Sequence, residues 1–195
     1  MTTIRPPAVA GQFYPARSRE LEEMIRDWLE TGPLTPSTVP PKALIVPHAG
    51  YIYSGEVAAN AFRLLKPFHA VIQRVVLIGP AHRVPLTGLS MSGADWFETP
   101  LGKIPIDKRA RLLLERYPQI SIQDAPHVAE HSLEVQLPFL QLLLDQFELI
   151  PLVKGARDRG RKSPKFWKSP GRSGDTVCDQ FRTSAIFWMM FSAGN

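Results

Sequence analysis

The pattern of apolar and polar positions over residues 1–153 predicts a mixed α/β fold. Apolar side chains recur at helical spacing from Ser18, a candidate N-cap, to Glu30. Short apolar runs predict three buried strands, which are Ala43–Val46, Val75–Ile78 and Leu149–Val153. Three further stretches have helical patterns: one from its cap Ser54 to Leu65, one from Asp107 to Tyr117, and one from Ser132 to Asp145 that is interrupted near Pro138.

This pattern breaks down after Val153. Residues 154–175 are rich in Lys, Arg, Gly, Ser and Pro, whereas residues 184–193 are apolar and have no evident partner segment. A solvated basic tail, a fused segment and translation in the wrong reading frame all produce such a break. The apolar cluster at 187–191 would be exposed in a soluble tail, which favours a frameshift. We therefore expect residues 154–195 to be an atypical basic tail, disordered or frameshift-derived.

Composition and charge exclude several classes of function. The chain has 195 residues, of which 44% are apolar and 21% charged, which suits one soluble domain. Its net charge is +5, but nine Lys/Arg against three Asp/Glu give residues 154–195 a net charge of +6 and leave −1 for the rest. The folded body is therefore not expected to bind nucleic acid. Binding of DNA or anionic lipid by the tail alone is a separate hypothesis.

No segment predicts export or a membrane span. A single cysteine, Cys178, excludes an internal disulfide, and we expect a cytoplasmic protein. The sequence has no P-loop, dinucleotide-binding glycine pattern or nucleophile elbow, which disfavours nucleotide binding and serine hydrolysis.

Two histidines follow predicted strands and are candidate metal ligands. His48 comes after Ala43–Val46 and His82 after Val75–Ile78, with one predicted helix between the strands. Strand–helix–strand units pair their strands in parallel, so both carboxyl ends lie at the edge where α/β sheets bind ligands. Imidazole is a preferred ligand of iron, copper and zinc. A lone histidine is more often structural, and the paired placement is what predicts a metal site.

A third candidate group is the segment 130–134. His131 stands at a predicted helix start, and Glu134 lies one turn later on the same face. We expect His131 to be a catalytic acid/base or a ligand, and Glu134 to orient it or to bind metal. The alternative is that Glu130 and Glu134 only stabilise the helix N-terminus. His69 and His127 have no such context and are expected on the surface or in loops.

Four sequence blocks, in order, resemble the Memo family, whose prokaryotic members are often labelled AmmeMemoRadiSam system protein B. The blocks are residues 7–15 (PAVAGQFYP), 47–51 (PHAGY), 79–82 (GPAH) and 130–139 (EHSLEVQLPF). The resemblance runs from about residue 5 to Val153. It implies the fold of class III extradiol dioxygenases, a three-layer α/β fold with helices on both faces of a sheet.

The resemblance also implies roles for individual residues. His48 and His82 match the two metal-binding histidines of the family, and His131 matches a third histidine at the same pocket. The family's ligand set is completed by a later cysteine, and a Ser-Ser-Asp-Phe-x-His segment follows the strand that matches 149–153. Neither is recognisable here, and Cys178 lies in an unrelated context. Residues 1–153 are therefore expected to be the N-terminal portion of a Memo-like domain, truncated, with an incomplete site for iron or copper.

Two functions remain open at this point. One is a metal-binding protein with dioxygenase-like redox chemistry in an intact form, impaired in this chain because a thiolate ligand is missing. The other is a non-enzymatic module that binds metal or a peptide in the same cleft. A fold alone does not determine a reaction, so the resemblance does not decide whether the chain is an enzyme. In either case the expected partner is a small molecule or peptide.

Overall fold

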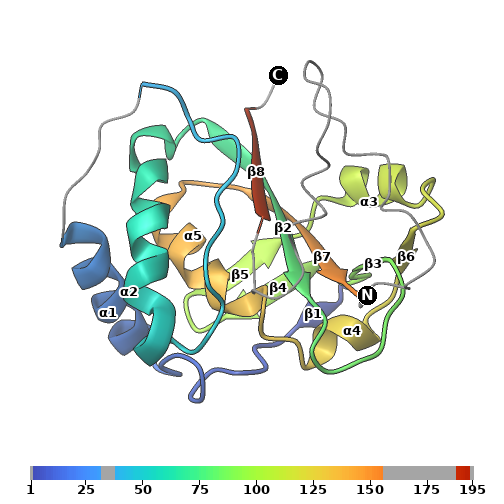
Figure 1. Ribbon diagram of the computed structural model, residues 1–195, viewed down its shortest axis with the longest axis horizontal. Coiled ribbons are helices and arrows are strands. Elements are labelled where there is room, and N and C mark those ends of the chain that lie inside the picture. The colour runs from blue at the N-terminus through green and yellow to red at the C-terminus, as the bar shows by residue number, and fades with distance from the viewer. Residues whose placement is uncertain (1, 32–37, 156–187, 194–195) are drawn as a thin grey trace.

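The computed structural model describes residues 2–31, 38–155 and 188–193, and it has a mixed α/β fold with two sheets (Figure 1). One sheet has the strand order β6-β3-β7-β2-β8, and the other has the order β1-β4-β5. The strands are β1 (Ile4–Arg5), β2 (Ile72–Pro80), β3 (Leu89–Met91), β4 (Trp96–Thr99), β5 (Gly102–Pro105), β6 (Ile120–Ile122), β7 (Glu148–Lys154) and β8 (Trp188–Ala193). The helices are α1 (Ser18–Glu30), α2 (Tyr51–Phe62), η1 (Arg63–Phe68), α3 (Lys108–Leu114), α4 (Ala125–Val128), η2 (Glu134–Gln136) and α5 (Leu137–Leu143). The α/β class is thereby confirmed.

Strands β2 and β7 form the centre of the five-stranded sheet. They are parallel, from Arg74 opposite Glu148 to Pro80 opposite Lys154. The predicted strands at residues 75–78 and 149–153 lie within them, so both predictions are confirmed. Strand β3 pairs antiparallel with β7 and parallel with β6, which completes this side of the sheet.

The predicted strand Ala43–Val46 is not a strand in the structure. Leu44 and Val46 are buried, but Ile45 is 57% exposed and the segment joins neither sheet. Both sides of β2 are already paired, one with β7 and the other with β8. The expected strand–helix–strand unit before His82 is therefore wrong, because β2 has no free edge for a parallel neighbour.

Strand β8 corrects a second expectation, that the apolar end of the chain has no partner. Residues 188–193 pair antiparallel with β2, with Met190 opposite Val76 and Ala193 opposite Ile72. The expectation of a disordered or frameshift-derived tail falls mostly on residues 156–187, which lie outside the described residues.

Helices α1, α2 and α5 pack against one another, on the left of the view in Figure 1, and α3 lies on the right. Gly55 permits the close approach of α1 and α2, because a Cβ there would lie 2.4 Å from the Trp28 ring. Phe62 stacks on Phe139 at 4.8 Å between ring centroids, which joins α2 to α5. Within the part of the chain that the structure describes, no helix is both long and apolar enough to cross a membrane.

The helix ends differ in detail from the predicted ones. Helix α1 spans the predicted residues, but Arg17 rather than Ser18 occupies the N-cap position. Helix α2 begins at Tyr51, so Ser54 lies inside it, where its hydroxyl donates to the carbonyl of Ala49 at 3.1 Å. The last predicted helix is interrupted as expected. It divides into η2 and α5, and Pro138 lies in the first turn of α5, where its missing N–H costs nothing.

Candidate metal centre

Three histidines lie together where the loop before α2, the loop after β2 and segment 130–136 meet. A ring nitrogen of each of His48, His82 and His131 lies within 4.8 Å of those of the other two. The ring centroids of His82 and His131 are 4.6 Å apart, and those of His48 and His82 are 5.2 Å apart. His48 is 5% exposed, whereas the His82 side chain is 37% exposed, so the group opens to solvent on the side of His82. The structure thus brings both predicted ligands together and adds His131 to them.

His48 is fixed in place although no strand precedes it. The Gln136 side-chain amide donates to the carbonyl of Pro47 at 2.9 Å. On the other side of His48, the Tyr51 hydroxyl donates to the carbonyl of Val135 at 2.8 Å. The loop that carries His48 is therefore anchored to residues 135–136 rather than to a neighbouring strand.

His82 follows the end of β2, and this end packs tightly against the segment that carries the third histidine. A Cβ on Gly79 would lie 2.7 Å from the Ser132 hydroxyl and 2.8 Å from the Leu133 side chain. The Ser132 hydroxyl also donates to the carbonyl of Pro80 at 2.9 Å. A glycine at position 79 is what allows β2 to reach this segment.

Glu130 joins the two histidine-bearing segments through its buried carboxylate. One oxygen lies 2.9 Å from Nδ1 of His82, and the other accepts the His82 backbone N–H at 2.6 Å. The backbone N–H groups of His131 and Ser132 donate to the same carboxylate, each at 2.9 Å. Sequence reasoning gave Glu130 only a helix-terminus role, because no spacing relates it to a histidine 48 positions away.

The surroundings of His48 and His131 favour neutral imidazoles, and those of Glu130 favour an ionised carboxylate. Burial, and then the neighbouring histidines, lower the pKa of His48 to about 4. Burial also lowers the pKa of His131. Burial opposes ionisation of Glu130, but hydrogen bonds from His82 and Ser132 outweigh it and lower the pKa of that carboxyl. Metal ligands must be deprotonated, so this is the state in which the group can bind a cation.

The donor set fits a first-row transition-metal ion. Nδ1 of His48 is buried without a hydrogen-bond partner, which is costly unless another group engages the ring, and Nδ1 of His131 lies 3.4 Å from the Glu130 carboxylate without a hydrogen bond to it. Three nitrogens bound to one ion at about 2.1 Å lie roughly 3.4–3.6 Å apart, so each ring nitrogen needs to move inward by less than about 1 Å. The contact of Glu130 with Nδ1 of His82 is the carboxylate–histidine arrangement that orients metal ligands.

Glu134 is fully buried against a different set of donors. It forms an ion pair with Arg5 and accepts the Tyr14 hydroxyl at 2.6 Å. The backbone N–H groups of Ala8 and Val9 donate to it at 2.9 and 3.0 Å. The structure therefore does not bring Glu134 into the group of three histidines. Glu130, four residues earlier, makes the contact with a histidine ring that was expected from Glu134, although its partner is His82.

The remaining two histidines lie outside the group. His69 is half-exposed and pairs with Asp145 at 2.8 Å, which matches the expected surface position. His127 is only 2% exposed and its Nε2 lies 3.0 Å from the carbonyl of Ser90, so the surface or loop prediction for it is wrong. Burial lowers the pKa of His127 to about 4, which makes it a neutral residue of the core.

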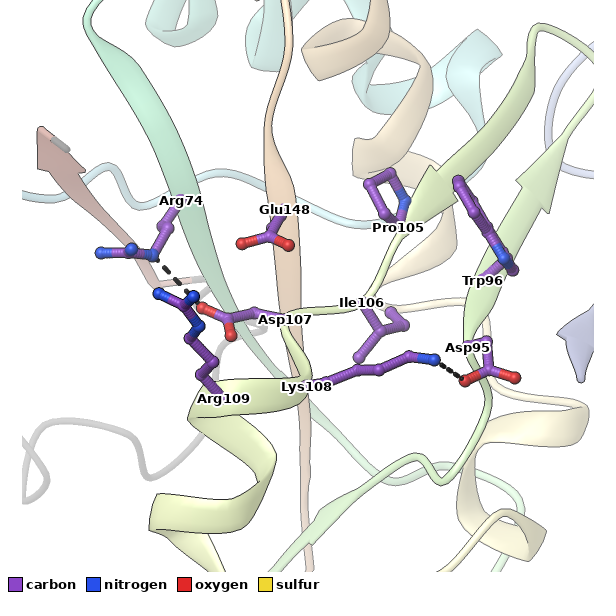
Figure 2. Close-up of a pocket in the computed structure, with 9 residues that line it drawn as sticks. All are labelled: Arg74, Asp95, Trp96, Pro105, Ile106, Asp107, Lys108, Arg109 and Glu148. Atoms are coloured by element: carbon purple, nitrogen blue, oxygen red, sulfur yellow. Dashed lines mark ion pairs between the residues drawn. The ribbon is translucent and has the colours of Figure 1, made fainter. Parts of the chain in front are cut away.

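A separate hollow of about 470 Å³ lies beside β2, β7 and the start of α3 (Figure 2). Arg74 pairs with Asp107 at 3.3 Å, and Lys108 pairs with Asp95 at 2.7 Å. The three histidines do not line it, and its paired charges leave little net charge for a ligand. The candidate metal centre is therefore a different site.

Comparison with known proteins identifies the family. Residues 5–164 match the family described as Memo-like protein. The chain belongs to the Memo family. This confirms the resemblance of the four sequence blocks, and the matched range contains His48, His82, His131 and Glu130.

Curated relatives of this Memo-family chain are longer than it is. A MEMO1 family protein of Ignicoccus hospitalis is 45% identical over 161 residues, which cover 77% of this chain and 56% of the relative. One of Aquifex aeolicus is 39% identical over 165 residues, 81% of this chain and 60% of the relative. One of Thermotoga neapolitana is 41% identical, over 76% of this chain and 57% of the relative. The Memo-family chain thus spans little more than half the length of the curated relatives it matches.

Proposed function

We propose that this Memo-family protein binds one first-row transition-metal ion, iron or copper, through His48, His82 and His131. The observation that carries the proposal is that the three rings place a nitrogen each within 4.8 Å of the others. The contact between Glu130 and His82 supports it, because a carboxylate on a ligand ring fixes the ring and raises its basicity. His131 takes the role of a third ligand in this proposal, in place of a free acid/base.

The residues of this chain determine the protonation state of the ligands and the access of a small molecule to the bound ion. His48 and His131 stay neutral at physiological pH and supply lone pairs. Three histidine ligands leave coordination positions open for an outside ligand, and the exposed side of His82 gives a small molecule access to them. Iron or copper in such a site supplies redox chemistry with dioxygen, as expected from the class III extradiol dioxygenase-like, three-layer fold. The proposed location is the reducing cytoplasm.

Metal stoichiometry tests the proposal. The full chain is dialysed against Co²⁺ as a spectroscopic probe, and the bound metal is counted in His48→Ala, His82→Ala and His131→Ala. His69→Ala is the matched control, because His69 is a surface residue outside the group. We expect one equivalent in the natural sequence and in the control, and far less in each of the three variants. Equal metal binding in all five proteins would refute the site.

The alternative function is a non-enzymatic module that binds metal or a peptide at the same histidines. Oxygen uptake with a panel of catechols distinguishes the two. Sustained uptake that depends on His48 supports the enzyme. Tight metal binding without any uptake supports the binding module.

A further inference from the structure

Arg5 holds the segment that carries the third histidine by three separate bonds. Its Nε donates to the carbonyl of His127 at 3.0 Å and one terminal nitrogen donates to the carbonyl of Glu130 at 2.6 Å. Its other terminal nitrogen pairs with the carboxylate of Glu134. All three acceptors belong to residues 127–134, so one buried guanidinium fixes both ends of the segment that contains His131.

The N-terminal segment supplies the rest of this attachment. Arg5 lies in β1, where it stands opposite Phe97 of β4, and its guanidinium lies 5.3 Å from the centre of the Phe97 ring. Ala8 and Val9 donate their backbone N–H groups to the carboxylate of Glu134, as does the hydroxyl of Tyr14. The three-stranded sheet and residues 8–14 are thereby tied to the segment 127–134.

Glu130 connects this attachment to the histidines. Its carbonyl accepts from Arg5, while its carboxylate accepts from the ring and backbone of His82 and from the backbone of His131. A shift of the Glu130 backbone therefore moves the carboxylate that orients His82. Arg5 itself lies outside the group of three histidines and is 5% exposed.

We propose that Arg5 is a positioning residue of the metal centre, which sets the distance between His82 and His131 by fixing the backbone of Glu130. This rests on the proposed function. An arginine is required, because the three acceptors are reached by three different nitrogens of one planar guanidinium, whereas the donors of an ammonium all radiate from a single nitrogen. A lysine at this position keeps the charge but cannot maintain the three bonds.

The test compares Arg5→Lys with Leu29→Ala in the full chain. Leu29 is 6% exposed and lies in α1, which packs against α2 and α5, so its truncation lowers the thermal midpoint from a position outside the contacts of Arg5. Both proteins are measured well below their thermal midpoints. We expect Arg5→Lys to weaken Co²⁺ binding by about 10–100-fold, and Leu29→Ala to bind within about threefold of the natural sequence.

A second measurement does not depend on the metal. Amide hydrogen exchange in the metal-free protein reports the backbone N–H groups of His131 and Ser132, which Glu130 holds. We expect both to exchange faster in Arg5→Lys than in the Leu29→Ala control. If Arg5→Lys does not fold, Glu134→Gln serves instead, because it keeps one acceptor oxygen for the donors of Val9 and Tyr14 and replaces the oxygen that pairs with Arg5 by an amide donor.

The outcomes separate the two proposals. Equal Co²⁺ affinity and equal exchange at residues 131–132 in Arg5→Lys and the control would overturn the role of Arg5. Failure of the natural sequence to bind Co²⁺ would overturn the proposed function, while the exchange rates would still decide whether Arg5 positions the segment. A loss of affinity in the control as large as in Arg5→Lys would reduce Arg5 to a purely structural residue.

Discussion

At the scale of single residues, Glu130 explains how two distant parts of the chain form one site. Its carboxylate accepts four hydrogen bonds. Two come from His82 in the loop after β2, and two come from the backbone N–H groups of His131 and Ser132, so the carboxylate holds His82 and His131 in a fixed relative position. Burial of a charge is costly unless it is fully paired, and these bonds satisfy that condition. The sequence predicted that the histidines are candidate ligands. It could not predict the contact of Glu130 with His82, because that contact depends on tertiary structure.

Replacement of Glu130 by Gln tests whether the Glu130 carboxylate orients His82. The amide group retains one acceptor oxygen and loses the charge, so His82 is no longer held by a carboxylate. We expect Co²⁺ affinity to fall by about 10–100-fold in a competition titration against a chromophoric chelator. Glu22→Gln is the control, because the Glu22 side chain is 42% exposed and pairs with Arg26, away from the three histidines. An affinity of Glu130→Gln equal to that of the control would contradict the orienting role.

The pKa values of His48 and His127 predict how stability of the metal-free protein depends on pH. Both values are about 4 in the folded state, below the ordinary value of 6.5, so the unfolded chain binds more protons between these pH values. Stability is therefore full above about pH 6.5 and decreases as the pH falls toward about 4, by on the order of 1 kcal/mol per pH unit for each histidine. Urea unfolding across this range measures the slope, and His127→Gln reduces it. A stability independent of pH over the range would show the burial argument to be wrong.

At the scale of secondary-structure elements, the sequence predicted the central strands and missed how the loop before α2 is held. The runs 75–78 and 149–153 are buried on a parallel ladder, which is what continuous apolar strands indicate. The run 43–46 has a similar composition but forms no strand, because backbone pairing on β2 is taken by β8. His48 still reaches the site because Gln136 and Tyr51 anchor its loop. The predicted convergence of His48 and His82 is thus found in the structure, although the topology from which it was predicted is partly wrong.

The contact between β2 and the segment 130–136 makes Gly79 a sensitive position. A Cβ at this position would collide with the side chains of Ser132 and Leu133, whereas the nearest atom to a Cβ on Gly93 would be an oxygen of Asp124 at 3.4 Å. We expect Gly79→Ala to lower the free energy of unfolding by about 1–3 kcal/mol and to weaken Co²⁺ binding, because His82 is displaced. Gly93→Ala is the control in the same urea titration. Similar stability of the two variants would mean that β2 does not pack as described.

At the scale of the whole molecule, the two sheets are connected by the bridge of Ile106 with Leu149 and by the N-terminal segment, which reaches the residues around the candidate metal centre. Strand β1 belongs to the three-stranded sheet, and its Arg5 reaches the segment that joins the histidines beside the five-stranded sheet. The sequence indicated an α/β fold, but a two-residue strand such as β1 carries no periodic signal and could not be predicted. The pairing of β8 with β2 was equally unpredictable, because it joins segments more than 100 positions apart.

Removal of residues 188–195 tests the place of β8 in the fold. The structure pairs this strand with β2, so its loss leaves an apolar strand with an unpaired edge, which is a site of edge-to-edge association. We expect a lower thermal midpoint and concentration-dependent oligomers in size-exclusion chromatography with light scattering. Deletion of residues 194–195 alone is the control. A truncated chain that remains monomeric with an unchanged midpoint would show that β2 does not need this partner.

We propose that three imidazoles, and no thiolate, hold the metal ion in this chain. X-ray absorption at the metal edge of the loaded full chain identifies the ligand atoms, because imidazole rings and sulfur atoms scatter differently. We expect nitrogen ligands at about 2.1 Å with the ring signature of three imidazoles, and a signature of two imidazoles for the residual metal that His131→Ala retains. A sulfur ligand at about 2.3 Å, which only Cys178 or a methionine could provide, or a spectrum without imidazole would contradict this proposal.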